Sequence, residues 1–437
     1  MQRLFWIGIV LVGWIVVETT PAVAQHAFQT QRGYVPSVEV LGRGDAAAAL
    51  PGEARPLFYN PAHLAVLPGR VTAFQFHGGG SGHLADQLRL LRGPINRQQI
   101  QRPGTKLDNW RTIRDSTQIV GPRPSMADIS LALPSFIYRQ GPVGISAGAF
   151  VHSAVDQRFG SGGAGFPSID VHSRTDALLL GAVGYDASRW VDGLAVGLTT
   201  KFTQRYLSHI NAPVGQLPDN ENVPLTGASP MIDQVFIFGI DEQQSPVWAA
   251  HAVGLDIGLH YTIPWHEGPG TVTVAGAAFD VLTSGFSYTL HDEAPSLPVL
   301  SSLLPDQTPF VAEGNLEVPD TLPEADRFAL HPSYRVGAAY TLDALGPLDN
   351  LAVALDYQNY RQPAVEQVFP AQLHMGAQAQ YDILIGRVGL NQGYVTFGAG
   401  LRMGHIHVDY AFYGREEGRV PGETYHYVNT VQVALRF

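Results

Sequence analysis

The last fourteen residues of the chain, Thr424 to Phe437, alternate between two kinds of side chain. Tyr425, Tyr427, Val431, Val433, Leu435 and Phe437 fall on one parity, and His426, Thr430, Gln432, Ala434 and Arg436 fall on the other. Val428 and Asn429 depart from this pattern. A period of two predicts a strand with two different faces. A final strand that ends on an aromatic residue is typical of outer-membrane barrels, in which it pairs with the first strand and leaves no open edge. The alternative is the last strand of a soluble β-sandwich.

The composition favours the barrel over the sandwich. Only 15% of the residues are charged and 45% are hydrophobic, whereas about a quarter of the residues in soluble proteins are charged. A barrel with a lipid-facing exterior and a wet interior has this balance. The formal net charge of −11 argues against nucleic acid as a partner.

Residues 1–24 have the pattern of a cleaved signal peptide. Arg3 supplies a positive start, Leu4 to Val17 is uncharged and apolar, and Ala22-Val23-Ala24 is a small-residue cleavage site. A membrane anchor helix needs about 20 apolar residues, so this run is too short for one. We therefore expect export to the outer membrane of a Gram-negative-type bacterium. The chain has no Cys, so its stability depends on strand pairing rather than on disulfides.

Alternating runs recur from residue 71 to residue 437. They predict an all-β transmembrane antiparallel β-barrel of about 14 strands. Tight turns alternate with long connections near 78–126, 207–250 and 289–330, and this asymmetry is typical of outer-membrane barrels. Aromatic residues near the expected strand ends predict interfacial girdles: Trp190, Trp248, Trp265, Tyr357, Tyr360, Tyr394, Tyr413 and Tyr425.

Residues 25–70 show no clear strand pattern, and we interpret them as a plug, or hatch, inside the barrel. Asp45 is placed to cap a helical turn over Ala46–Leu50. Further along, Pro61 suits the first position of a short helix. A candidate hatch and ligand path comprises Phe58, Tyr59, Asn60, Pro61 and Ala62, because the two aromatic residues suit an apolar ligand.

The segment Phe58-Tyr59-Asn60-Pro61-Ala62-His63-Leu64-Ala65 resembles a motif of the FadL/TodX outer-membrane transport superfamily and its PorV/PorQ-like relatives. His63 stands where that group usually has Gly. The blocks 386–401 and Val408–Phe412 resemble strands near the C-terminus of the same group. The resemblance implies a barrel with an N-terminal hatch. It also implies one of two functions: a passive channel for hydrophobic small molecules such as long-chain fatty acids, or a partner of secreted proteins in a secretion system.

Polar residues on the last strands are expected to face the lumen: Arg402, His405, His407, Asp409 and Arg436. The spacing of His405, His407 and Asp409 would suit a metal on one strand face. Every lumenal face must show alternate polar residues, however, so we expect no metal there. Phe437 is a candidate signal for the barrel insertion machinery, and outer-membrane lipid is the expected surrounding of the apolar face.

Two glycine-rich stretches invite a comparison with phosphate-binding loops. Gly78–Gly82 lacks the Lys and Ser/Thr of such a loop, so we interpret it as flexible, and 161–165 likewise. The sequence offers no nucleophile–base pair. We therefore expect no enzyme activity and no cofactor.

Overall fold

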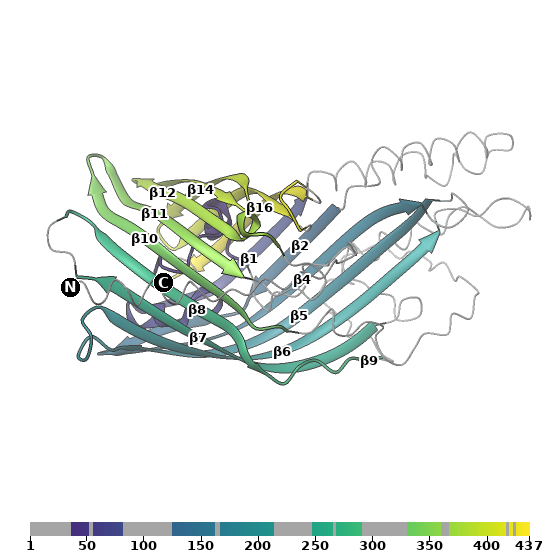
Figure 1. Cartoon of the computed structure of the whole chain (residues 1–437), viewed down its shortest axis with the longest axis horizontal. Coiled ribbons are helices and arrows are strands. Elements are labelled where there is room, and N and C mark those ends of the chain that lie inside the picture. The colour runs from purple at the N-terminus through teal and green to yellow at the C-terminus, as the bar shows by residue number, and fades with distance from the viewer. Residues whose placement is uncertain are drawn as a thin grey trace, which may run out of the picture.

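In the computed structural model, the strands form one antiparallel sheet that closes into a barrel (Figure 1). The structure describes residues 36–51, 56–81, 125–161, 167–213, 247–264, 268–290, 330–359, 367–416, 419–422 and 425–437. The predicted signal peptide and large parts of the three long connections lie outside these ranges.

The barrel wall contains sixteen strand segments. They are β1 (Arg70–Ser81), β2 (Ser125–Ala132), β3 (Ser135–Gln140), β4 (Val143–Ser161), β5 (Pro167–Asp186), β6 (Leu194–Pro213), β7 (Val247–Ile263), β8 (Thr271–Thr283), β9 (Thr289–Leu290), β10 (Ser333–Leu345), β11 (Leu348–Asn359), β12 (Leu373–Tyr381), β13 (Leu384–Asn391), β14 (Tyr394–Met403), β15 (Ile406–Glu416) and β16 (Tyr425–Arg436). Both β2 and β3 pair with β1 and β4, and both β8 and β9 pair with β7, so each of these pairs fills one position. The described wall therefore has fourteen positions, which confirms the predicted number.

The last strand closes the barrel as predicted. β16 pairs antiparallel with β1, from Thr72 opposite Arg436 to Ser81 opposite Val428. Val71 and Phe437 exchange two backbone hydrogen bonds of 2.8 Å each. The strand that opens the sheet and the strand that ends the chain thus satisfy each other's edges.

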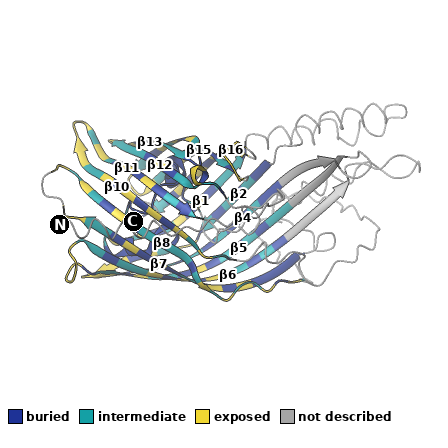
Figure 2. Cartoon of the chain, viewed as in Figure 1, coloured by how far each residue is buried: buried dark blue, intermediate teal, exposed yellow. Residues whose placement is uncertain are grey.

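Buried and exposed residues alternate along the strands (Figure 2), and the exposed side chains of the outer face are apolar whereas the inner face is rich in polar side chains. Burial along β16 alternates at every residue from Tyr425 to Ala434. Large exposed side chains such as Leu179, Leu259 and Phe397 are apolar, whereas buried side chains include Arg205 and Gln432. This is the inverse of a soluble barrel and defines a membrane-spanning wall. Among the described residues, no helix is long and apolar enough to cross a membrane.

Several strands extend further than the alternation predicted. Gly78–Ser81 is not a loop, because it continues β1 and pairs with both β16 and β2. A Cβ at Gly79 would lie 2.7 Å from the Asp128 carboxylate, so glycine leaves room for that side chain within the sheet. Likewise β6 runs to Pro213 and β7 begins at Val247, so the second long connection is shorter than predicted. The segment 162–166 lies outside the described residues.

Three short helices follow one another ahead of β1: α2 (Val38–Gly42), α3 (Pro56–Tyr59) and η2 (Pro61–Ala65). A further short helix, η5 (Phe369–Gln372), precedes β12. The first three lie against the inner face of the wall, with α2 on β13–β16 and η2 on β3–β7. The helical turn expected over Ala46–Leu50 is absent, so this prediction was wrong. The Ala47 and Ala48 N–H groups donate to Asp356 of β11 and not to an Asp45 cap. The internal segment, residues 36–51 and 56–67, thus lies across the lumen.

Candidate functional site

Asn60 fixes the Asn-Pro-Ala turn to its surroundings. Its Oδ1 accepts from the Ala62 N–H at 3.0 Å and so caps η2, with Pro61 at the first helical position as predicted. Its Nδ2 donates to the Ala48 carbonyl and to the Leu259 carbonyl of β7, each at 3.0 Å. One side chain therefore joins two parts of the internal segment and the barrel wall.

A row of glycines receives this turn on the wall. Gly144, Gly184, Gly197 and Gly258 are direct cross-strand partners on β4, β5, β6 and β7. A Cβ at any of the four would collide with Asn60, Pro61, Leu64 or Ala65; at Gly184 it would lie 2.7 Å from the Ala65 nitrogen. The backbone of η2 thus packs directly on the backbone of the wall, an approach that only glycine permits.

The aromatic residues of the motif are buried against the wall rather than placed along an open path. Phe58 packs edge-on against Phe150 of β4, with ring centroids 4.9 Å apart. The Tyr59 ring lies under the Arg335 guanidinium at 4.9 Å, and its hydroxyl accepts from the Ser37 N–H at 3.0 Å. A ligand path along Phe58, Tyr59, Asn60, Pro61 and Ala62 stays a prediction, and in this structure these side chains are packed.

A second attachment lies on the opposite wall. The backbone from Gly42 to Gly44 packs on Gly376, Gly389 and Gly398 of β12, β13 and β14. Asp45 accepts from Arg335 at 3.3 Å, and its carbonyl accepts from Gln358 at 2.8 Å. The internal segment is therefore held at both sides of the lumen.

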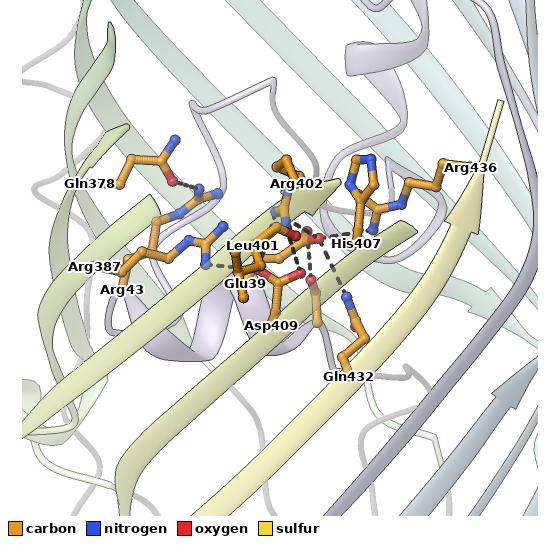
Figure 3. Close-up of polar contacts among 11 residues, drawn as sticks. Glu39, Arg43, Gln378, Arg387, Leu401, Arg402, His407, Asp409, Gln432 and Arg436 are labelled. Atoms are coloured by element: carbon orange, nitrogen blue, oxygen red, sulfur yellow. Dashed lines mark hydrogen bonds and ion pairs between the residues drawn. The ribbon is translucent and has the colours of Figure 1, made fainter. Parts of the chain in front are cut away.

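A charged cluster ties α2 to the closing strands (Figure 3). Glu39 accepts from Arg436 at 2.8 Å and lies 3.6 Å from Arg402. Asp409 accepts from Arg402 at 3.1 Å and from Arg387 at 2.9 Å. Three guanidinium groups thus share two carboxylates, and Glu39 is the one that the internal segment supplies.

Electrostatics keep Glu39 ionised within this cluster. Burial by itself would raise the pKa of the Glu39 carboxyl. Arg436 and Arg402 lower that pKa by more, so it lies well below its ordinary value. The carboxylate is therefore charged throughout the physiological range and neutralises part of the wall.

The structure brings four of the five polar residues proposed for the lumen into or beside this cluster. Arg402, Asp409 and Arg436 belong to it, and His407 contacts the Arg436 guanidinium at 3.3 Å. His405 instead lies in the turn before β15, exposed and stacked on Phe437 with ring centroids 4.5 Å apart. His405, His407 and Asp409 therefore do not share one strand face. The recognition of Phe437 by the insertion machinery remains a prediction.

His63, at the position where related motifs have Gly, is fully buried beside a second histidine. Its ring meets the His260 ring of β7 edge-on, with centroids 5.3 Å apart. Burial lowers the pKa of His63 well below its ordinary value, and His260 and Arg43 lower it further against the effect of the Ala48 backbone. The docked segment therefore holds His63 neutral.

We expect the attachment of this segment to weaken in acid. Docking of the internal segment lowers the pKa of His63, so this histidine binds a proton more readily in the undocked state. Docking therefore loses stability as the pH falls below 6.5. The loss is up to about 1.4 kcal/mol per pH unit for one proton. Unfolding midpoints across this range should fall less for His63→Gln than for the wild type. The exposed His251→Gln should behave as the wild type does, and a wild-type slope in His63→Gln would contradict this account.

The wall is irregular beside the internal segment, between β2 and β3. Between β2 and β3, Pro134 has no N–H with which to continue the ladder. A cavity of about 20 Å³ lies there, lined by Leu57, Phe136 and Phe150 among others. This volume has room for about one water molecule.

Sequence reasoning missed Glu39 and the glycine rows. Glu39 occurs in an otherwise apolar run, Val38 to Leu41, and an isolated acid there was the available signal. The glycines become a row only through the strand register. Glu39 and Arg436 are separated by 397 positions in the sequence, and neither residue by itself predicts a contact with the other.

The closed strand pairing and the apolar exterior define a β-barrel of the outer-membrane type, and the internal segment packs against the inner face of its wall. No protein-family model matches the chain, and no curated protein matches it. Among solved structures, the toluene transporter TbuX of Ralstonia pickettii gives a TM-score of 0.47 at 14% identity, covering 93% of this chain and 98% of that one.

Two further solved structures are similar. The Pseudomonas putida toluene transporter TodX gives a TM-score of 0.43 at 11% identity, covering 95% of this chain and 99% of that one. A Pseudomonas aeruginosa FadL homologue gives 0.38 at 9% identity, covering 92% and 98%. TodX and the FadL homologue are of the group that the Asn-Pro-Ala motif resembles. At these identities the likeness transfers no residue role to this chain.

Proposed function

We propose that the protein is a passive outer-membrane channel for hydrophobic small molecules, and that the internal segment belongs to its hatch, which the sequence predicts over residues 25–70. Long-chain fatty acids are among the ligands that we expect. The protein needs outer-membrane lipid around its apolar face and no energy source.

The observation that carries this proposal is an apolar contact between the hatch and the inner wall. Leu57, Phe58 and Tyr59 pack on Ala132, Phe150 and Leu178, next to the irregular wall between β2 and β3. A buried Leu or Phe side chain contributes about 1.5–3 kcal/mol. A hydrophobic molecule in the lumen would compete for this patch, whereas a hydrophilic solute gains nothing there. The contact therefore supports a hatch that responds to apolar ligands.

The secretion alternative depends on loops 78–126 and 289–330 as docking surfaces. Most of these residues lie outside the described ranges, so no observation favours that function. Secreted proteins as partners remain a sequence-based expectation.

A deletion strain tests the channel proposal. We expect loss of the gene to slow uptake of labelled toluene, oleate or both, and the wild-type gene to restore it. Entry of nitrocefin, a hydrophilic probe, should not change. Unchanged uptake of both hydrophobic probes would contradict the proposal, and co-purification of secreted proteins would then favour the alternative.

A further inference from the structure

A second apolar cluster lines the lumen and contains no hatch residue. Leu207 of β6, Trp248 and Ala250 of β7, and Tyr288 are buried together, with Phe286 packed against them. Trp248 was predicted to lie in an interfacial girdle, but it shares the inner-facing parity of β7 and is only 4% exposed. The sequence could not show this, because Trp248 falls within the long connection expected near 207–250 and the alternating pattern of β7 begins after it.

Hydrogen-bond donors at this cluster lack acceptors. Trp248 Nε1 and Arg174 Nε and Nη1 are buried and make no hydrogen bond in the part of the chain that the structure describes. Arg174 forms an ion pair with Asp176, whose carboxylate oxygen lies 3.5 Å from the Arg174 Nε. Both oxygens of Asp176 already accept from Arg205, at 2.7 and 2.9 Å. Two guanidinium groups therefore share one carboxylate.

The strand register places the unmet donors on either side of Leu207 on the inner wall. Arg174 of β5 pairs directly with Leu207 of β6, and Leu207 pairs directly with Trp248 of β7. Side chains of such cross-strand pairs lie about 4.5–5.5 Å apart at Cβ. The donors thus flank Leu207, on the aromatic surface that Phe286 and Tyr288 complete.

An anionic acceptor would satisfy these buried donors. An unmet buried donor costs about 1–3 kcal/mol, and more when it is charged. A neutral hydrocarbon would cover the aromatic surface but would leave Arg174 to share the Asp176 carboxylate with Arg205. A carboxylate supplies the missing charge and the acceptor oxygens together.

We propose that Arg174, Trp248 and Phe286 form a binding site for an aromatic carboxylate in the lumen. The ring of the ligand packs on Trp248 and Phe286, and its carboxylate accepts from Arg174 and from the Trp248 N–H. This inference rests on the proposed channel function, because it names one ligand class that enters the lumen.

The test is equilibrium binding to the full-length barrel in nanodiscs, with empty nanodiscs subtracted. The probes are 2-naphthoate and its neutral ester, methyl 2-naphthoate. The wild type should bind the carboxylate more tightly than the ester. Arg174→Met should weaken 2-naphthoate binding by about 10- to 150-fold, the effect of a lost charge-assisted hydrogen bond, and should leave ester binding within about twofold. The half-exposed Arg139, paired with Asp186 at 3.7 Å, supplies the matched control Arg139→Met.

A structural role for Arg174 makes a different prediction. If Arg174 only supports the wall, Arg174→Met should lower the unfolding midpoint. Removal of a guanidinium with unmet donors should leave the midpoint unchanged or raise it. Equal binding of carboxylate and ester by the wild type, or unchanged carboxylate affinity in Arg174→Met, would overturn the proposal. Should that variant not assemble, the wild-type comparison decides alone. Because binding is measured without transport, failure here is distinguishable from failure of hydrocarbon uptake.

Discussion

Replacement of Glu39 by Gln is expected to lower the free energy of unfolding of the barrel by about 3–5 kcal/mol, the cost of removing one partner from a buried ion pair. Glu39 is the carboxylate that the internal segment contributes to Arg436 and Arg402, at 2.8 and 3.6 Å. Gln keeps the shape and removes the charge. Asp409 would then be left to neutralise three guanidinium groups. Urea unfolding of the barrel in lipid vesicles measures the change.

Two further variants isolate the charge effect. The exposed Asp349→Asn should change stability by less than about 0.5 kcal/mol. Adding Arg436→Met to Glu39→Gln should recover part of the loss, because the uncompensated cation is removed as well. Unchanged stability in Glu39→Gln, or additive losses in the double variant, would show that Glu39 does not hold the hatch to the closing strand.

Replacement of Gly184 by Ala is expected to displace the end of η2 from the wall. The new methyl carbon would lie 2.7 Å from the Ala65 nitrogen, and overpacking of this kind costs about 1–3 kcal/mol. Because the chain has no Cys, Ala65→Cys provides a single label site that is fully buried when docked. Maleimide labelling at this site should increase about 5- to 150-fold when Gly184→Ala is added.

The same strand supplies the control. A Cβ at Gly181 of β5 would meet its nearest atom at 3.7 Å, an ordinary contact, so Gly181→Ala should leave labelling unchanged. Equal labelling in the two glycine variants would mean that the glycine row does not determine where the internal segment docks.

Side-chain alternation in the sequence was sufficient to predict most of the barrel fold. The two faces of the last strand, and the pairing of that strand with the first, follow from a period of two and from the need to satisfy strand edges. The ends of the strands could not be predicted in this way. Gly78–Ser81, for example, has no side-chain alternation, and its pairing with β16 and β2 keeps it in β1.

The candidate site was less accessible from the sequence. Turn chemistry correctly predicted Pro61 at the start of a short helix, because proline and its neighbours act locally. The glycine row depends on register among four strands, and the chain has 47 glycines from which to choose. Glu39 acquires its role from strands at the far end of the chain, and a single sequence contains no signal of that contact.

The most direct test of the central claim is the uptake of a labelled neutral hydrocarbon, toluene, by intact cells, relative to nitrocefin entry in the same cells. For a hydrophobic channel with a movable hatch, this ratio should fall when the gene is deleted, return with the wild-type gene, and rise with Gly184→Ala while nitrocefin entry stays low. If deletion lowers toluene uptake and nitrocefin entry equally, the ratio does not change. That result would contradict a selective hydrophobic channel and identify a general porin.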